Sequence, residues 1–227
     1  MNRVLVLLLL PVSIVLFCKP GKPPVRPELT SFARPVKGTL PWFIGKDMNP
    51  VFQKPAEKSK LRGLRNLSLV NQHGQRVTQE DLGGRLVAMS FFFTSCRGIC
   101  PMVTENMKIV SRAFQNDSEV VMLSISVDPL RDNPERMKEY CAEHKIDKAN
   151  WHLLSGPEEK VYQIAREQFD ADVELLKGGG QAKPSDDFLH SELVYLLDRE
   201  GLLRGMYRAR GTAGMHKLVK DIEQLKQ

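Results

Sequence analysis

The sequence predicts an α/β domain built around a central mixed β-sheet. Two continuous apolar runs, at residues 85–93 and 120–127, have the length and composition of strands that are buried on both faces. Segments with apolar residues at helical spacing follow each run, and the chain closes with a predicted hairpin and a last helix. Strands that alternate with helices in this way are typical of an α/β domain.

The first half of the domain begins with two short strands. Residues 64–78 read as a pair of strands around a turn at His73-Gly74. The apolar run 85–93 then predicts a buried strand that ends in a loop with two cysteines. Beyond this loop, apolar residues recur at helical spacing and predict a helix: Val103, Met107, Val110 and Phe114.

The second half continues the alternation. The run 120–127 predicts another buried strand, and residues 132–144 predict a helix in which Pro134 suits the first turn. A strand is expected to start at Trp151. The remaining segments predict a helix over 156–169, a flexible Gly-rich loop over 177–187, a hairpin over 191–207 that turns near Glu200-Gly201, and a last helix with Met215, Leu218, Val219 and Ile222 on its apolar face.

Composition narrows the class of function. With 227 residues, 42% of them apolar, the chain suits one domain with appendages. The net charge of +6 is spread among acidic residues, which is typical of a solvated surface. The sequence contains no zinc-finger spacing, phosphate-cradling Gly-rich loop or RNP-like aromatic motif. Nucleic acid is therefore excluded as a partner.

The N-terminus predicts export. Arg3 precedes an apolar stretch from Val4 to Phe17, whose length suits the core of a signal peptide better than a bilayer span. Cys18 stands where a bacterial lipoprotein is cleaved and lipidated, although Phe17 is bulky for the position before it. An uncleaved membrane anchor and full release are the alternatives. We expect the remainder to lie in the bacterial periplasm, held at the membrane by lipid on Cys18 or by an uncleaved N-terminal segment.

Three regions follow from this pattern. Residues 1–18 are the signal, lipoprotein signal or anchor. Residues 19–37 form a Pro-rich tether, because this stretch is rich in proline and has no apolar periodicity. Residues 38–227 form the folded domain.

The cysteine pair is the candidate site. Cys96 and Cys100 lie between the end of a core strand and the start of a helix, the edge at which open α/β sheets bind ligands. The N–H groups of a helix N-terminus favour thiolate, and Arg97 adds positive charge. We expect at least one thiol to have a pKa below the free value of about 8.5. The spacing alone leaves open a redox-active disulfide pair, a soft-metal site and two buried thiols without function.

A metal would need a further ligand besides the two thiolates. Two thiolates and an imidazole suit Cu(I), whereas zinc would need a fourth ligand. His190 is the candidate, because it enters the last hairpin directly from the Gly-rich loop; the other histidines fit ordinary structural positions: His73, His144, His152 and His216. Cys141 falls on the apolar stripe of its predicted helix and is expected in the core.

In four ordered motifs the sequence resembles the Sco/SenC family of thioredoxin-like copper-binding proteins, which take part in cytochrome c oxidase assembly. The resemblance covers residues 38–225. Its motifs are a strand–turn–strand segment that leads to CxxxCP, then "SISVDPLRDNPERMKEY", "WHLLSGPEEKV" and "HSELVYLLDREG". It implies a thioredoxin-like fold with an N-terminal hairpin extension.

The resemblance also implies a ligand set. Carried over by position, the family's copper ligands correspond to Cys96, Cys100 and His190. The expected ion is Cu(I), with Cu(II) as a second oxidation state. Asp128, in the SVDP-like segment, is either a residue that supports the site or one that only stabilises its own loop. The sequence departs from the family pattern where an acidic residue is usual, at Arg97-Gly98-Ile99 and at Leu189. These departures make the site less negative, which should alter metal affinity, redox potential or partner docking.

Two functions follow from the resemblance. The first is a metallochaperone that delivers copper to the dinuclear copper centre of cytochrome c oxidase subunit II, with other copper chaperones or thiol reductants as further partners. The alternative is a thiol–disulfide oxidoreductase that reduces the cysteines of that subunit. His190 favours the first, because disulfide exchange does not need a remote imidazole.

Overall fold

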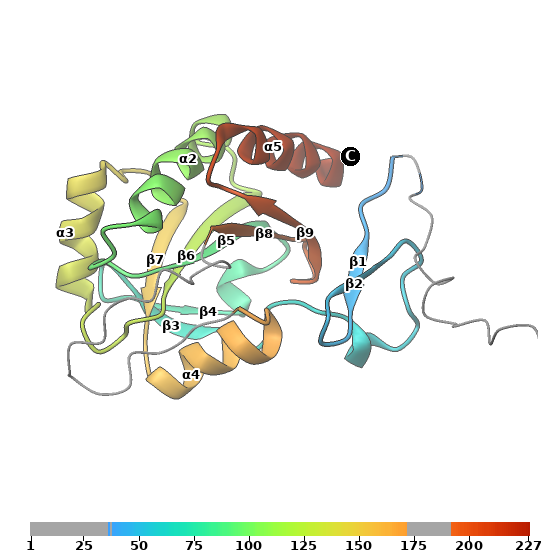
Figure 1. Ribbon diagram of the computed structural model, residues 1–227, viewed down its shortest axis with the longest axis horizontal. Helices are drawn as coiled ribbons and strands as arrows, with labels where there is room; N and C mark the ends of the chain where they lie inside the picture. The colour runs from blue at the N-terminus through green and yellow to red at the C-terminus, as the bar shows by residue number, and fades with distance from the viewer. Residues whose placement is uncertain (1–35, 37, 172–191) are drawn as a thin grey trace, which may run out of the picture. The chain divides into compact units, whose positions relative to one another are not determined.

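The computed structural model describes residues 36, 38–171 and 192–227, and these residues contain a seven-stranded mixed sheet (Figure 1). The strand order is β4-β3-β7-β6-β5-β8-β9. Neighbours are parallel in β5/β6 and β6/β7 and antiparallel elsewhere. The strands are β3 (Ser68–Asn71), β4 (Arg76–Thr78), β5 (Leu86–Phe92), β6 (Val120–Ser126), β7 (Trp151–Ser155), β8 (Leu193–Leu197) and β9 (Leu203–Arg208). The central mixed sheet predicted from the sequence is confirmed.

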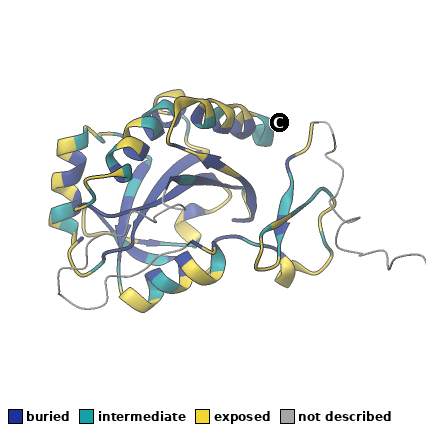
Figure 2. Ribbon diagram, in the orientation of Figure 1, coloured by how far each residue is buried: buried dark blue, intermediate teal, exposed yellow. Residues whose placement is uncertain are grey.

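The centre of the sheet is fully enclosed. Every residue of β5 and of β6 is buried, and Figure 2 shows the strands as the buried interior of the fold. The two strands pair in parallel along their whole length, from Leu86 opposite Val120 to Phe92 opposite Ser126. Strands covered on both faces are mostly apolar, which explains why both appear as long apolar runs in the sequence; their buried serines are hydrogen-bonded, Ser90 with Ser124 and Ser126 with Asp132.

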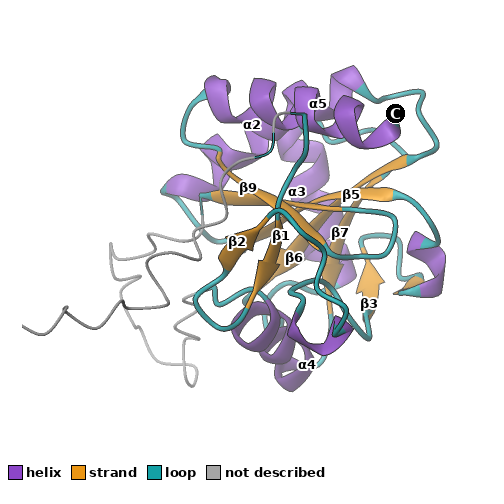
Figure 3. Cartoon of the chain, turned by 90° about the vertical axis from the view of Figure 1, so that its right-hand side faces the viewer, coloured by secondary structure: helices purple, strands orange, loops and turns teal. Residues whose placement is uncertain are grey.

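Helices cover both faces of the sheet (Figures 1 and 3). Helices α2 (Ile99–Ala113) and α5 (Thr212–Lys226) pack side by side on one face, and α4 lies on the other. Helix α3 (Pro134–His144) begins at Asn133, whose side chain accepts the Arg136 N–H at 2.8 Å. Pro134 stands in the first turn of α3, as predicted.

One predicted helix changes its pitch midway. The expected helix over 156–169 is an α-helix, α4 (Glu158–Tyr162), that continues as a π-helical segment, η3 (Gln163–Gln168). The predicted apolar face is nevertheless buried. Phe169, at the end of η3, stacks edge-on against Tyr195 with ring centroids 4.9 Å apart.

A second, smaller sheet precedes the main one. The predicted strands around His73-Gly74 are β3 and β4, and β1 (Trp42–Ile44) and β2 (Asn49–Val51) form the N-terminal antiparallel hairpin that the resemblance implied. Arg204 joins this hairpin to β9: it donates to the carbonyl oxygens of Leu40 and Pro41, and its guanidinium lies 4.0 Å from the centroid of the Trp42 ring. Two short 3-10 turns complete the description, η1 (Lys58–Lys60) and η2 (Glu80–Leu82).

Several sequence predictions fall outside the described residues. These are the signal or anchor segment with Cys18, all of the tether except residue 36, the Gly-rich loop 177–187, and His190. Their assignments stay predictions. Within the ranges that the structure does describe, none of the helices has the length and apolar character to cross a bilayer.

Candidate thiol and metal site

The strand–helix junction brings the two predicted cysteines together. Strand β5 ends at Phe92, the chain turns with the Cys96 N–H donating to the carbonyl of Phe93, and Cys100 stands in the first turn of α2. Their surroundings differ. Cys96 is half-buried, whereas Cys100 is only 1% exposed. Both carry free thiols, so the structure describes the reduced pair.

The two thiols also differ in acidity. The pKa of Cys96 is lowered to about 6, chiefly because its sulfur accepts a hydrogen bond from the Cys100 thiol. The backbone N–H groups of Cys100, Gly98 and Ile99 add to the effect, which outweighs the opposing effect of burial. The lowered pKa agrees with the prediction of an acidic thiol, and the helix N-terminus contributes to it. Arg97 is exposed, and the lowered pKa is explained by hydrogen bonds.

Cys100 behaves in the opposite way. The pKa of Cys100 is raised because its S–H group donates a hydrogen bond to the sulfur of Cys96. Burial and the negative charge of Cys96 raise it further. At neutral pH the pair therefore holds one proton between two sulfurs, with the negative charge on the more exposed one. Such a pair can attack a disulfide through Cys96, and it can offer a thiolate to a soft metal ion.

The acidity of Cys96 leads to a direct test. Alkylation of Cys96 by iodoacetamide should follow an inflection near pH 6 in the wild-type chain, because the thiolate is the reactive form. Cys100→Ala should move this inflection upward, since the substitution removes the thiol that donates to Cys96. Mass spectrometry of the modified peptide against pH would measure both. An inflection at or above about 8.5 in the wild type would contradict the assignment.

A buried carboxylate lies beside the pair. Asp132 is fully buried and accepts hydrogen bonds from the Thr94 N–H at 3.0 Å, from the Thr94 hydroxyl at 2.5 Å and from the Ser126 hydroxyl at 2.5 Å. Its negative charge contributes to the raised pKa of Cys100. Thr94 precedes the cysteine loop, so Asp132 fixes the segment that leads into the site.

Asp128 serves its own loop. It is 8% exposed, its carboxylate pairs with Arg131 at 3.0 Å, and its carbonyl accepts the N–H groups of Arg131 and Asp132. Burial raises the pKa of Asp128, and the neighbouring Arg131 opposes this. These contacts match the loop-stabilising alternative considered for Asp128.

Sequence reasoning missed Asp132 and Tyr140. The signal for Asp132 was present, because the DPLRD segment contains two aspartates and only the first was singled out. Tyr140 shares a hydrogen bond with Thr104 at 3.0 Å, and its raised pKa comes mainly from burial, with the charges of Cys100 and Cys96 adding to it. Its position on the inner face of α3 gave no sign that it lies close to the cysteines.

The remaining cysteine has the predicted structural role. Cys141 belongs to the hydrophobic core, and burial raises its pKa to about 11. Such a thiol is protonated and unreactive at neutral pH. Within the described part of the chain no group of three or more His, Cys, Asp or Glu side chains is arranged to hold a metal ion. The predicted third ligand, His190, is not among those residues.

The topology places the start of β8 at the cysteine end of the sheet. Strands β5 and β8 are antiparallel, with Ser90 opposite Val194, so β8 begins at the edge where β5 ends. The chain is held there by Glu192, whose carbonyl accepts the Ala209 N–H at 2.7 Å and whose carboxylate accepts from Arg210 at 2.8 Å. His190 precedes Glu192 by two positions in the sequence.

Comparison with known proteins identifies the family and agrees with the fold. The SCO1/SenC family model matches residues 55–227. A SCO1/SenC family lipoprotein from Bacillus anthracis is 28% identical, with a TM-score of 0.63 over 73% of this chain and 96% of that one. BsSco, for which a disulfide switch is described and which is named as a Sco family cytochrome c oxidase assembly protein, is 24% identical, with a TM-score of 0.62 over 77% and 97%. ScoI from Bradyrhizobium japonicum, solved with copper bound, is 26% identical, with a TM-score of 0.58 over 72% and 99%. These likenesses confirm the thioredoxin-like fold.

Proposed function

Because this chain belongs to the SCO1/SenC family, we propose that it binds copper through Cys96, Cys100 and His190 and delivers it to the dinuclear copper centre of cytochrome c oxidase subunit II. The observation that carries the proposal is the cysteine pair itself. The pair combines a half-exposed sulfur of lowered pKa with a buried sulfur that hydrogen bonds to it. Copper is cargo in this role, and the protein takes it up and releases it.

The donor chemistry supports a soft metal ion. Cu(I) prefers thiolates and accepts low coordination numbers, so two cysteines and an imidazole suffice for it. Binding requires Cys100 to lose its proton, and a bound cation favours that loss despite the raised pKa of the free thiol. Among the structural relatives, ScoI from Bradyrhizobium japonicum has been solved with copper bound.

A second function has its own supporting observation. The acidic, half-exposed Cys96 beside the protonated, buried Cys100 is also the arrangement of an attacking and a resolving thiol. The alternative proposal is therefore a thiol–disulfide oxidoreductase that reduces the cysteines of subunit II. The disulfide switch described for BsSco concerns the same kind of chemistry in that protein.

Copper stoichiometry in two redox states tests the metal site. The reduced chain is expected to bind one Cu(I), and the chain with a Cys96–Cys100 disulfide is expected to bind none, because disulfide sulfurs are no longer thiolates. Titration of both forms against a chromophoric Cu(I) chelator measures this. Equal copper binding by the two forms would exclude the cysteine pair as the ligands.

Anchoring at the membrane belongs to the same proposal. We place the chain in the bacterial periplasm, attached by lipid on Cys18; a relative from Bacillus anthracis is named a lipoprotein. Cys18→Ser is expected to abolish labelling by a radioactive or alkyne-tagged fatty acid and to change the membrane-bound fraction. Unchanged lipid labelling and processing of Cys18→Ser would contradict the lipoprotein assignment and leave the uncleaved anchor.

A further inference from the structure

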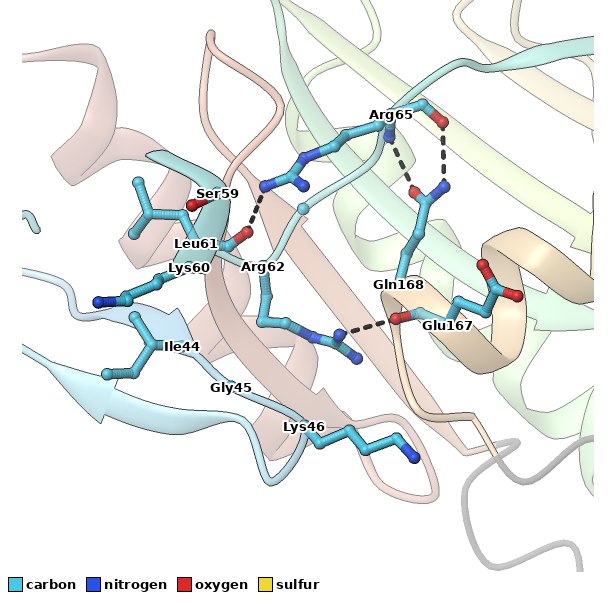
Figure 4. A pocket seen from close by; sticks show the side chains of 11 residues that line it. Ile44, Gly45, Lys46, Ser59, Lys60, Leu61, Arg62, Arg65, Glu167 and Gln168 are labelled. Atoms are coloured by element: carbon cyan, nitrogen blue, oxygen red, sulfur yellow. Dashed lines mark hydrogen bonds between the residues drawn. The ribbon is translucent and has the colours of Figure 1, made fainter. Parts of the chain in front are cut away.

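A basic cavity lies where the β1–β2 hairpin, residues 58–65 and the end of η3 meet (Figure 4). Its volume is about 460 Å³, within the range of about 300–1,000 Å³ that is common for small-ligand sites. None of the residues that line it belongs to the cysteine site. Four lining residues are cationic and one is acidic: Lys46, Lys60, Arg62, Arg65 and Glu167.

The cations differ in how far they are already paired. Lys60 makes an ion pair with Glu57 at 2.5 Å, and the Arg65 guanidinium donates to the carbonyl oxygens of Lys58 and Leu61. Lys46, on the turn of the β1–β2 hairpin, has no ion pair with any described residue. The cavity therefore keeps an excess of positive charge after its internal pairs are counted.

Arg62 is the unusual member of this group. Its Nη1 donates to the carbonyl oxygen of Glu167 at 2.7 Å. Its Nε and Nη2 are buried and have no hydrogen-bond partner among the described residues. These two nitrogens form one edge of the guanidinium, the fork that binds two oxygens of a carboxylate or phosphate side by side. Buried donors without acceptors are unfavourable, so an anion that meets this edge is favoured.

Burial is the main cause that lowers the pKa of Arg62; the negative charge of Asp170 opposes it, and the positive charge of Arg65 adds a smaller lowering. Because burial makes the charged guanidinium less favourable, an anion that reaches it is favoured.

The backbone around the cavity is fixed before any ligand binds. The Arg62 N–H donates to the carbonyl of Phe43 at 2.8 Å, and the Arg62 carbonyl accepts the Leu203 N–H at 2.9 Å. Gln168 clamps Arg65 from both sides, accepting its N–H at 2.8 Å and donating to its carbonyl at 3.1 Å (Figure 4). The backbone at Arg62 and Arg65 is therefore held by contacts within the protein.

We propose that this cavity binds a phosphate group, with the Nε–Nη2 edge of Arg62 holding two of its oxygens and Lys46 or Arg65 neutralising the rest. A tetrahedral oxyanion offers more acceptors than a carboxylate, and this matches a cavity lined by several cations. The phosphate can be a free ion or the headgroup of an anionic phospholipid, because both present the same oxygens. This binding is separate from copper or disulfide chemistry.

The test uses the full-length, copper-free chain in detergent at constant ionic strength. Isothermal titration with inorganic phosphate is expected to show saturable binding at one site per chain. Arg62→Gln should weaken it at least tenfold, and Arg62→Lys should weaken it as well, since lysine keeps the charge but loses the fork. Lys54→Gln is the matched control: Lys54 is an exposed cation paired with Glu200 and does not line the cavity, so phosphate binding should be unchanged.

Vesicles separate the two sources of phosphate. If phosphatidylglycerol vesicles bind the wild type and Lys54→Gln but bind Arg62→Gln at least tenfold more weakly, and if inorganic phosphate competes, the ligand is a headgroup. If only inorganic phosphate depends on Arg62, the ligand is the free ion. The proposal is overturned if the wild type shows no saturable phosphate binding, or if Arg62→Gln and Lys54→Gln lose it equally. Circular dichroism of both Arg62 variants checks that the fold is intact.

Discussion

Replacing His190 with alanine is expected to weaken Cu(I) binding to the reduced chain by more than the roughly ten- to hundredfold that is typical of losing an outer-shell partner. The substitution removes one of three proposed ligands and leaves two thiolates, which alone hold the ion less firmly. Thiol–disulfide exchange should survive, because it needs only an attacking thiolate and a reachable sulfur. Chelator competition measures the affinity, and exchange with a model disulfide measures the thiol chemistry.

The controls for this result are built into the chain. His216 is an exposed histidine on α5, so His216→Ala should leave the Cu(I) affinity unchanged. Cys96→Ser should lose both copper binding and disulfide exchange, whereas Cys100→Ser should lose copper binding and stop exchange at the mixed disulfide on Cys96, because it lacks the resolving thiol. Oxidase assembly in cells that carry each variant distinguishes the two proposed functions. If His190→Ala matches the wild type in copper affinity and in assembly, the metallochaperone proposal is wrong and the oxidoreductase proposal remains.

Asp132→Ala is expected to lower the free energy of unfolding by about 3 kcal/mol. The substitution leaves the Thr94 N–H, the Thr94 hydroxyl and the Ser126 hydroxyl without their common acceptor, and each buried donor without a partner costs roughly 1–3 kcal/mol. For a chain of this size the midpoint of thermal unfolding should fall by roughly 6–12 °C. The Asp132→Ala substitution should also lower the pKa of Cys100, because the negative charge of Asp132 contributes to the raised pKa of that thiol.

Asp128→Ala provides the comparison within the same loop. Its ion pair is with Arg131, which is largely solvent-exposed, and such pairs contribute about 0–1 kcal/mol. The variant should therefore unfold within a few degrees of the wild type and leave the reactivity of the cysteines unchanged. Equal destabilisation by Asp128→Ala and Asp132→Ala would show that Asp132 has no special place beside the site. Thermal unfolding followed by circular dichroism gives both values.

Patterns with a local physical cause were predictable from the sequence. The runs that became β5 and β6 could be recognised because strands covered on both faces are predominantly apolar. The site followed from chemistry as well as pattern, since two cysteines between a buried strand and a helix start meet the N–H groups that acidify one of them. The pairing of the strands into one sheet also agreed with the alternation of elements.

The features that the residue pattern alone did not predict depend on contacts between distant segments. The N-terminal hairpin was expected only from the family resemblance, because β1 and β2 have three residues each and β2 contains Pro50, so no periodic signal marks them. Their hairpin is held by Arg204, which belongs to β9. Asp132 was missed because its importance comes from Thr94, on the other side of α2 in the sequence. Such contacts arise only in the folded chain, so a single sequence does not show them.

The position of β5 in the sheet has a consequence for how the molecule folds. Its partner on one side, β6, follows shortly after it in the sequence, whereas its partner on the other side, β8, lies near the end of the chain. Contacts between distant segments form slowly, and during synthesis the N-terminal part appears first. We therefore expect both cysteines to meet oxidants before β8 has covered the open edge of β5. Pulse-labelling of thiols during refolding would then find Cys96 and Cys100 reactive while the edge of β5 is still unpaired, although Cys100 is buried in the finished fold.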